Sequence, residues 1–162
     1  MPGPYIAQIC MNGHITARNI QTSPLFMRKY CEQCGEPTIT ACPHCQVPIR
    51  GEYQNGFIVL GIPELPAQLY CHNCGHPYPW TERRVQAIKD LIDGLAELTP
   101  ADRKKLRSSF GDLLADTSRT ELAATSWKLI LGKLAPPTYE AVKALAFEVI
   151  TPVARSLIFC ML

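Results

Sequence analysis

Four closely spaced pairs of metal-ligand residues constrain this chain more than any other feature of its sequence. The pairs are Cys10 with His14, Cys31 with Cys34, Cys42 with Cys45, and Cys71 with Cys74. Together they offer seven thiols and one imidazole, which are the eight ligands that two tetrahedral zinc ions need. The sequence therefore predicts two Zn²⁺ ions, each held by four side chains, and a first half folded around them.

A site with four protein ligands has no open coordination position, so we expect structural rather than catalytic zinc. A small β module buries little apolar surface and depends on its metal, which contributes on the order of 10 kcal/mol per site. The competing interpretation is a secreted disulfide scaffold. Because no basic region followed by an apolar run opens the chain, we expect a cytoplasmic protein with reduced thiols.

An internal repeat bears on how the pairs combine. The motif aromatic-CxxCG-x-P occurs at residues 30–37 and again at residues 70–77. The repeat favours serial pairing, in which the first two pairs form one site and the last two form the other. Cross-braced pairing, in which the first pair joins the third and the second joins the fourth, remains open.

More than one histidine could be the eighth ligand. His14 lies in an Asn-Gly-His turn, where a histidine can also be an ordinary surface residue. His76, two residues after Cys74, is the strongest alternative. His44 and His72 lie inside CxxC loops, where side chains usually face solvent.

The composition changes near residues 77–81, and we place a domain boundary there. We expect an α+β protein: a double zinc ribbon of short β hairpins at 1–80, then a bundle of about four helices at 81–162. Asn55-Gly56 between strand-forming residues predicts a two-residue hairpin.

Helix signals fill the second half. Thr81, Thr99 and Thr120 are candidate starts, and Pro100 strengthens the second of them. Pro136 and Pro137 break the third helix, and a fourth runs from about Thr138 towards the end. The expected apolar stripes are Val85, Ile88, Ile92 and Leu95; Leu106, Phe110, Leu113 and Leu114; Leu122, Ala123, Trp127, Ile130 and Leu134; and Val142, Leu145, Val149, Val153 and Leu157. The apolar segment 145–162 is interrupted by Glu148 and Arg155, so we expect no membrane span.

Charge argues against phosphate binding by the first half. The formal net charge is +2, but a Cys₃His zinc site carries −1 and a Cys₄ site −2, so the loaded chain is −1. Residues 1–80 hold four basic and four acidic side chains, so two zinc ions would make that half −3. A module that follows phosphates should instead be basic. The basic run at 103–107 could touch phosphates, but we expect it to be a solvated helix face.

No catalytic constellation accompanies the ligands. The deaminase pattern H-x-E with P-C-x-x-C is absent, and the βαβ context of a redox CxxC is absent too. We therefore expect a non-catalytic protein-interaction module, with a protein partner or a second copy bound through the apolar C-terminal helices. The alternatives are a nucleic-acid- or transcription-linked zinc-ribbon factor and an enzyme with an open zinc site.

The motifs Cys-x-Asn-Gly-His, aromatic-CxxCG-x-P-Thr, CPxCxxPIRG and YCxNCGxPYPWT resemble an uncharacterised bacterial zinc-ribbon family, domain of unknown function 2321. The first eighty residues carry most of the resemblance, which implies zinc binding and a helical C-terminal region but no activity. Gln46 stands where a ribbon knuckle usually has glycine.

Overall fold

Two compact units divide the chain, Met1–Arg83 and Arg84–Leu162. The computed structural model describes residues 4–22, 24–53 and 66–159. The division falls inside helix α1 (Pro79–Gly94), whose first residues belong to unit 1 and whose remainder belongs to unit 2. The expected boundary after residue 80 also lies within this helix.

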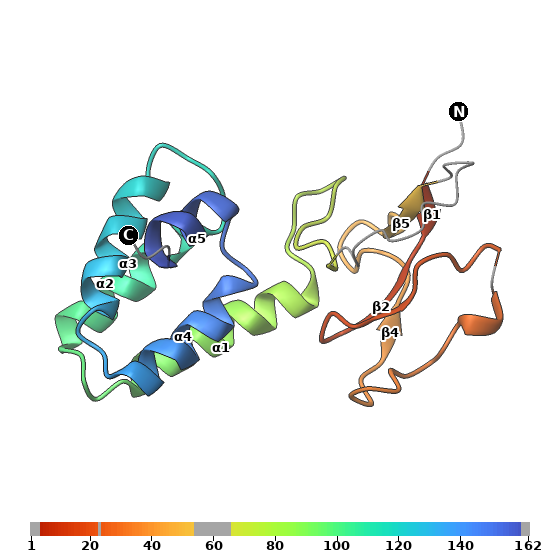
Figure 1. Cartoon of the computed structure of the whole chain (residues 1–162). Helices are drawn as coiled ribbons and strands as arrows, with labels where there is room; N and C mark the ends of the chain where they lie inside the picture. Colours follow the sequence, from red (N-terminus) through yellow and green to blue (C-terminus); the bar gives the residue numbers. More distant parts are fainter. Residues whose placement is uncertain (1–3, 23, 54–65, 160–162) are drawn as a thin grey trace. The chain divides into compact units, whose positions relative to one another are not determined.

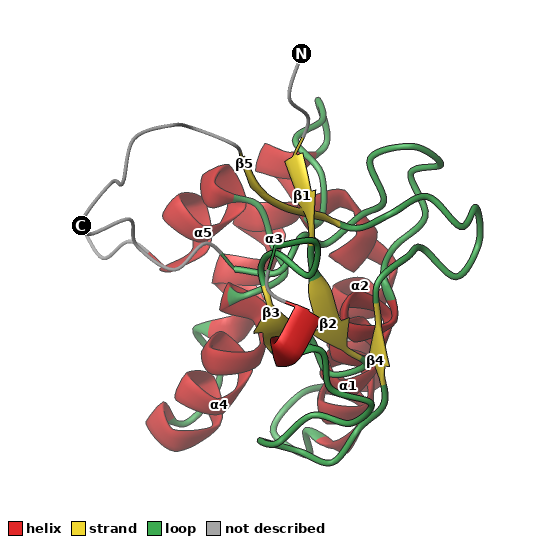
Figure 2. Ribbon diagram, turned by 90° about the vertical axis from the view of Figure 1, so that its right-hand side faces the viewer, coloured by secondary structure: helices red, strands yellow, loops and turns green. Residues whose placement is uncertain are grey.

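Unit 1 is made of very short antiparallel strands. Strand β2 (Gln8–Cys10) lies between β3 (Ile15–Ala17) and β4 (Thr38–Ile39), as Figure 2 shows. Strand β1 (Pro4–Ile6) pairs with β5 (Arg50–Tyr53) in a second sheet. A single turn of 3₁₀ helix, η1 (Pro24–Phe26), lies between β3 and β4 in the sequence. The predicted Asn55-Gly56 hairpin lies outside the described residues.

The apolar core of unit 1 is small. It consists of seven buried residues among those described: Ala7, Ile9, Cys42, Ile49, Cys71, Tyr78 and Trp80. The rings of Tyr78 and Trp80 stack with their centroids 4.6 Å apart, and the Trp80 indole N–H donates to the Gln68 carbonyl. Two of the seven are cysteines of the ligand pairs, so metal ligands form part of the apolar core.

Unit 2 is helical (Figure 1). After α1 come α2 (Pro100–Ser109), the 3₁₀ turn η2 (Phe110–Leu113), α3 (Thr120–Leu131), α4 (Pro136–Phe147) and α5 (Pro152–Phe159). The α+β prediction, with short strands followed by a helical bundle, is confirmed. No helix in the described part of the chain is long and apolar enough to cross a membrane.

The core of unit 2 is much larger, with twenty buried apolar residues among those described. Trp127 on α3 is fully buried against Phe110, with ring centroids 5.3 Å apart. Its indole N–H donates to the Ser109 hydroxyl at 3.1 Å. Burial of this extent makes a large hydrophobic contribution to the stability of the bundle.

The start of α2 follows the sequence signal. The Thr99 hydroxyl accepts a hydrogen bond from the Asp102 N–H at 3.1 Å, and Pro100 occupies the first turn. The expected cap at Thr81 is wrong, because α1 begins two residues earlier, at Pro79. Thr81 is buried instead, and its hydroxyl donates to the Leu69 carbonyl at 2.7 Å.

Two predicted apolar stripes need correction. Leu122 is 68% exposed, because it lies five residues from Trp127 and therefore on another side of α3. The fourth predicted helix is two helices, α4 and α5. Pro152 has no N–H to continue the first, and the Thr151 hydroxyl accepts from the Ala154 N–H to cap the second. This break leaves Val153 and Leu157 partly exposed rather than buried in one stripe.

Candidate metal centres

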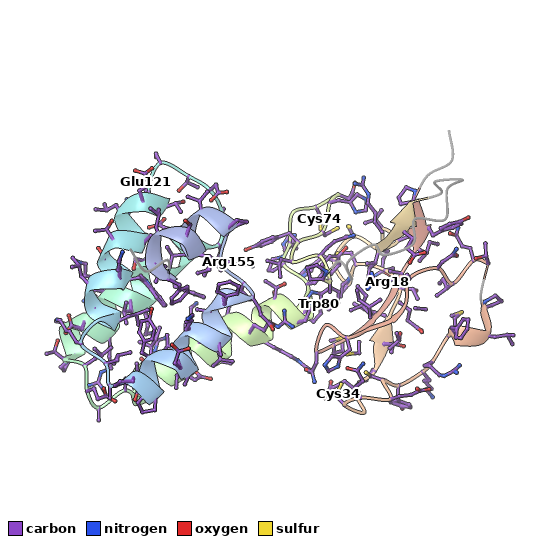
Figure 3. All side chains as sticks on the ribbon, viewed as in Figure 1. Arg18, Cys34, Cys74, Trp80, Glu121 and Arg155 are labelled. Atoms are coloured by element: carbon purple, nitrogen blue, oxygen red, sulfur yellow. The ribbon has the colours of Figure 1, made fainter. Side chains whose placement is uncertain are left out.

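The structure gathers the four ligand pairs into two groups. The Cys₃His cluster comprises Cys10, His14, Cys31 and Cys34, and the Cys₄ cluster comprises Cys42, Cys45, Cys71 and Cys74. In each cluster the four donor atoms all lie within 4.8 Å of one another, so either could hold a metal ion. The grouping is the serial one that the repeat favours, not the cross-braced one. Cys34 and Cys74 mark the two separate clusters in Figure 3.

Distances in the Cys₃His cluster suit one tetrahedral ion. The Sγ atoms of Cys10 and Cys34 are 3.7 Å apart, and His14 Nδ1 lies 3.5 Å from Cys10 Sγ and 3.6 Å from Cys31 Sγ. Zn–S bonds of about 2.3 Å and Zn–N bonds of about 2.0 Å give tetrahedral edges of about 3.8 Å and 3.5 Å. The donors are therefore spaced as a zinc ion would space them.

The Cys₄ cluster has the same spacing. Cys42 and Cys74 are 3.7 Å apart at Sγ, and Cys45 and Cys71 are 3.6 Å apart. A disulfide would bring two sulfurs to about 2.0 Å. All seven cysteines of the two clusters are free thiols, so the described residues do not form a disulfide scaffold.

Three of the four pairs share one backbone conformation. A β-bridge closes each loop across seven residues, at Tyr30 with Pro37, Ala41 with Pro48, and Tyr70 with Pro77. In each loop the first cysteine's N–H donates to the carbonyl five residues later, at 2.8 to 2.9 Å. The residue after the second cysteine donates its N–H back to the first cysteine's carbonyl. This conformation holds both sulfurs of a pair on one side of the loop.

The residue after the second cysteine has a left-handed backbone in all three loops. Its φ is +72° at Gly35, +71° at Gly75 and +59° at Gln46. Gln46 is the one non-glycine with positive φ in the described part of the chain. Its side-chain amide donates to the Pro43 carbonyl at 3.1 Å, which helps to hold a conformation that side chains disfavour. The Cys42–Cys45 loop thus keeps the shared geometry without its glycine.

The fourth pair uses a different turn. The Cys10 N–H donates to the His14 carbonyl, and the His14 N–H approaches Cys10 Sγ at 3.3 Å. Gly13 in this turn has φ of +88° and lies against Trp80, where an added Cβ would be 3.1 Å from the Trp80 Cβ and Cγ. The Cys₃His cluster is therefore positioned on the same tryptophan that fills the core of unit 1.

Backbone N–H groups favour the ionised thiols. The N–H two residues later lowers the pKa of Cys34 to about 7 and lowers the pKa of Cys45. The Cys74 N–H lowers the pKa of Cys71 to about 6. For Cys74 the His76 N–H also acts to lower the pKa, but burial and the neighbouring thiols raise it to about 12. Four adjacent sulfurs cannot all ionise without a cation, and a divalent ion would remove that conflict.

The rival histidines lie outside the two groups of donor atoms. His44 and His76 stack on each other with ring centroids 4.2 Å apart, on adjacent loops of the Cys₄ cluster. His72 is exposed within the Cys71–Cys74 loop. The structure therefore places His14, and not His76, with the three thiols of the first cluster.

Nearly the whole chain is similar to one protein family. Residues 4–158 match a family described as "Uncharacterized protein conserved in bacteria (DUF2321)". No curated protein and no solved structure matched.

Proposed function

This chain belongs to DUF2321, and we propose that it binds two structural zinc ions and serves as a non-catalytic protein-interaction module. The observation that carries the proposal is the closed geometry of the two clusters. Each offers four protein donors at tetrahedral spacing, so a bound ion needs no water and presents no position to a substrate. Zinc suits the donor set because thiolate and imidazole are its preferred ligands in structural sites.

Exposed apolar side chains support the interaction role. Leu25, Phe26 and Met27 are consecutive on and after η1 and are 87%, 60% and 47% exposed. In unit 2, Leu122 and Leu129 on α3 are 68% and 70% exposed. Large apolar side chains that gather on a surface commonly mark protein contacts. A protein partner or a second copy of the chain would cover them.

Partly exposed apolar side chains on the C-terminal helices offer a second contact. On α4 and α5, Leu145, Phe147, Val153 and Leu157 are between 38% and 46% exposed. Light scattering of the full chain tests whether they join two copies. A dimer that Leu157→Ser and Val153→Ser convert to monomer supports the homo-oligomer, whereas a strict monomer leaves a different protein as the partner.

Among the described residues, the enzyme alternative has a candidate position. A hollow of about 240 Å³ beside the Cys₃His cluster is lined by His14 and Cys31 and also by Glu32. A catalytic zinc there would need Glu32 as a free acid or base. That carboxylate instead accepts from Arg28 Nε at 2.8 Å. This ion pair is exposed and therefore weak, so the four-donor geometry is the stronger support for a structural role.

Metal analysis tests the proposal directly. We expect two zinc ions per chain by mass spectrometry, and cobalt-substituted protein should give the intense visible bands of tetrahedral thiolate coordination. His14→Ala should reduce the content towards one ion, while the matched change His76→Ala should keep two. One ion or none in the unaltered chain, or cobalt spectra of a five-coordinate site with bound water, would refute the closed structural assignment.

A further inference from the structure

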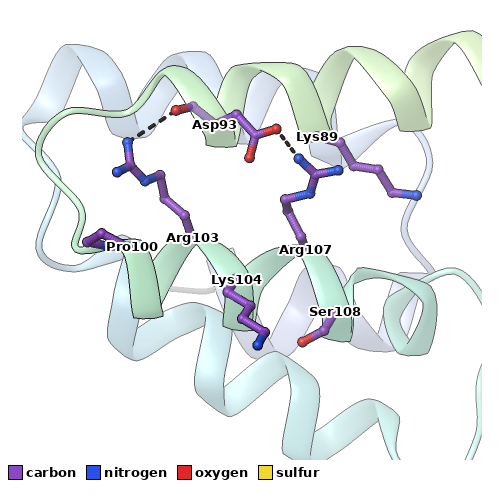
Figure 4. Close-up of a pocket in the computed structure, with 7 residues that line it drawn as sticks. All are labelled: Lys89, Asp93, Pro100, Arg103, Lys104, Arg107 and Ser108. Atoms are coloured by element: carbon purple, nitrogen blue, oxygen red, sulfur yellow. Dashed lines mark hydrogen bonds and ion pairs between the residues drawn. The ribbon is translucent and has the colours of Figure 1, made fainter.

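A basic hollow lies on unit 2, between the end of α1 and the start of α2 (Figure 4). It has a volume of about 500 Å³ and is lined by Lys89, Asp93, Pro100, Arg103, Lys104, Arg107 and Ser108. Four of these residues are cations and one is an anion, so the basic hollow has a net charge of +3. The sequence shows a basic run at 103–107, but only the fold adds Lys89 to it.

Two of the cations are held in place. Arg103 Nη1 donates to the carbonyls of Asp93 and Leu95, at 3.2 and 3.4 Å, where α1 ends. Arg107 Nη1 donates to the Asp93 carboxylate. These bonds involve one nitrogen of each guanidinium, and an arginine has five N–H donors in a planar fork. The arginines are therefore oriented and still have donors to offer.

The other two cations have no neutralising partner. In residues 4–22, 24–53 and 66–159, no hydrogen bond or ion pair holds the ammonium group of Lys89 or Lys104. Lys133, by contrast, is paired with Asp102 at 2.9 Å, and Lys143 with Glu140 at 3.7 Å. Two free ammonium groups and two oriented guanidinium groups in the lining of one hollow leave positive charge that a ligand could neutralise.

We propose that the basic hollow binds a ligand with adjacent phosphate groups. Arginine forks and lysine ammonium groups both bind phosphate oxygens, and several of them in one hollow suit more than one phosphate. The lining has no aromatic side chain on which a base could stack. Recognition therefore falls on the phosphates and not on bases. The proposal does not depend on zinc, since unit 2 contains no member of either cluster.

The charge of the two units agrees with this placement. Residues 84–162 hold eleven basic and nine acidic side chains, a net charge of +2. Residues 1–83 hold five of each, so two zinc sites would make them −3. Phosphate binding is therefore expected on unit 2 and disfavoured on unit 1.

Adjacent lysines provide a matched pair of variants. Lys104 lines the basic hollow, and Lys105 is the next residue on α2, is also exposed and does not line it. Lys104→Ala and Lys105→Ala remove the same charge from the same helix. If the hollow is a defined binding site, only Lys104→Ala should weaken binding. If an anion is merely attracted to a basic surface, both variants should weaken binding equally.

The experiment is a calorimetric titration of the full zinc-loaded chain with pyrophosphate and, separately, with a single-stranded oligonucleotide, both at low salt. We expect Lys104→Ala and Lys89→Ala each to weaken binding about tenfold, as for loss of one charge-assisted hydrogen bond, and Lys105→Ala to change it less than about twofold. Circular dichroism of each variant verifies that the helices are intact.

The two ligands distinguish the sources of phosphate. Binding of pyrophosphate supports a small polyphosphate, and binding of the oligonucleotide alone supports a nucleic-acid backbone. Absence of binding to both by the unaltered chain overturns the proposal. An equal loss in Lys105→Ala and Lys104→Ala overturns it too, because the hollow would then have no role.

Discussion

The two units differ in what stabilises their folds. In the described residues, the core cluster of unit 2 has twenty buried apolar residues, while that of unit 1 has seven, two of which are candidate metal ligands. Conformational entropy opposes folding by about 1–2 kcal/mol per residue in both. Unit 2 can offset this cost with apolar burial, whereas unit 1 has too little core to do so without its clusters. The lesson is that ligand pairs can take the place of a core.

Metal removal should give the largest difference in stability between the two units. We expect a chelator to unfold unit 1, because each structural zinc contributes on the order of 10 kcal/mol, and to leave the helices of unit 2 folded. Hydrogen exchange read by mass spectrometry measures this, with lost protection in residues 4–53 and retained protection in α3 and α5. Readdition of zinc is the control. Retained protection in unit 1 without metal would contradict the contrast.

Trp127→Ala should produce the reverse pattern. This side chain is fully buried and packs against Phe110, so its removal should cost unit 2 about 3–5 kcal/mol. The zinc content should stay the same, because all the residues of both clusters lie in unit 1. Denaturant unfolding followed by circular dichroism measures the loss. Leu129→Ala, on the same helix but 70% exposed, should cost little, and an equal cost for both would show that α3 is packed differently.

Gly13→Ala tests the link between a cluster and its small core. The new Cβ would press on Trp80 at 3.1 Å in a backbone with φ of +88°. We expect a cost of about 1–3 kcal/mol and weaker zinc binding by the Cys₃His cluster. Competition with a chromophoric chelator gives the affinity. Gly94→Ala is the control, because nothing lies within 4 Å of its added Cβ, and similar effects from the two would remove Trp80 from the explanation.

Gln46→Gly should give the smallest effect, and of the opposite sign. Relief of a left-handed backbone at φ +59° should stabilise unit 1 by on the order of 1 kcal/mol. Gly75→Ala changes the same position of the last loop in the other direction and should destabilise by a similar amount. Thermal unfolding of the zinc-loaded chain compares them. Destabilisation by Gln46→Gly would mean that the Gln46 bond to Pro43 outweighs the backbone strain.

Local signals were dependable where they act over a few residues. Thr99 and Pro100 start α2 as predicted, because a hydroxyl cap and a fixed φ act within one turn. The Thr81 cap failed, because Pro79 already starts the helix and Thr81 therefore lies inside it, where its hydroxyl donates to the Leu69 carbonyl. The predicted single final helix failed at Pro152, although proline at a first turn is itself a local signal that could have located α5.

The sequence by itself determined the ligand count, the α+β order of the two halves and the family, because these follow from residue type and spacing along the chain. Only the tertiary structure decided that the pairs combine serially, that His14 rather than His76 joins three thiols, and that Lys89 lines the same hollow as the basic run on α2. Each of these is a contact between segments far apart in the sequence or a choice between equivalent side chains. Spacing along a chain limits such contacts, but backbone hydrogen bonds and core packing select among them.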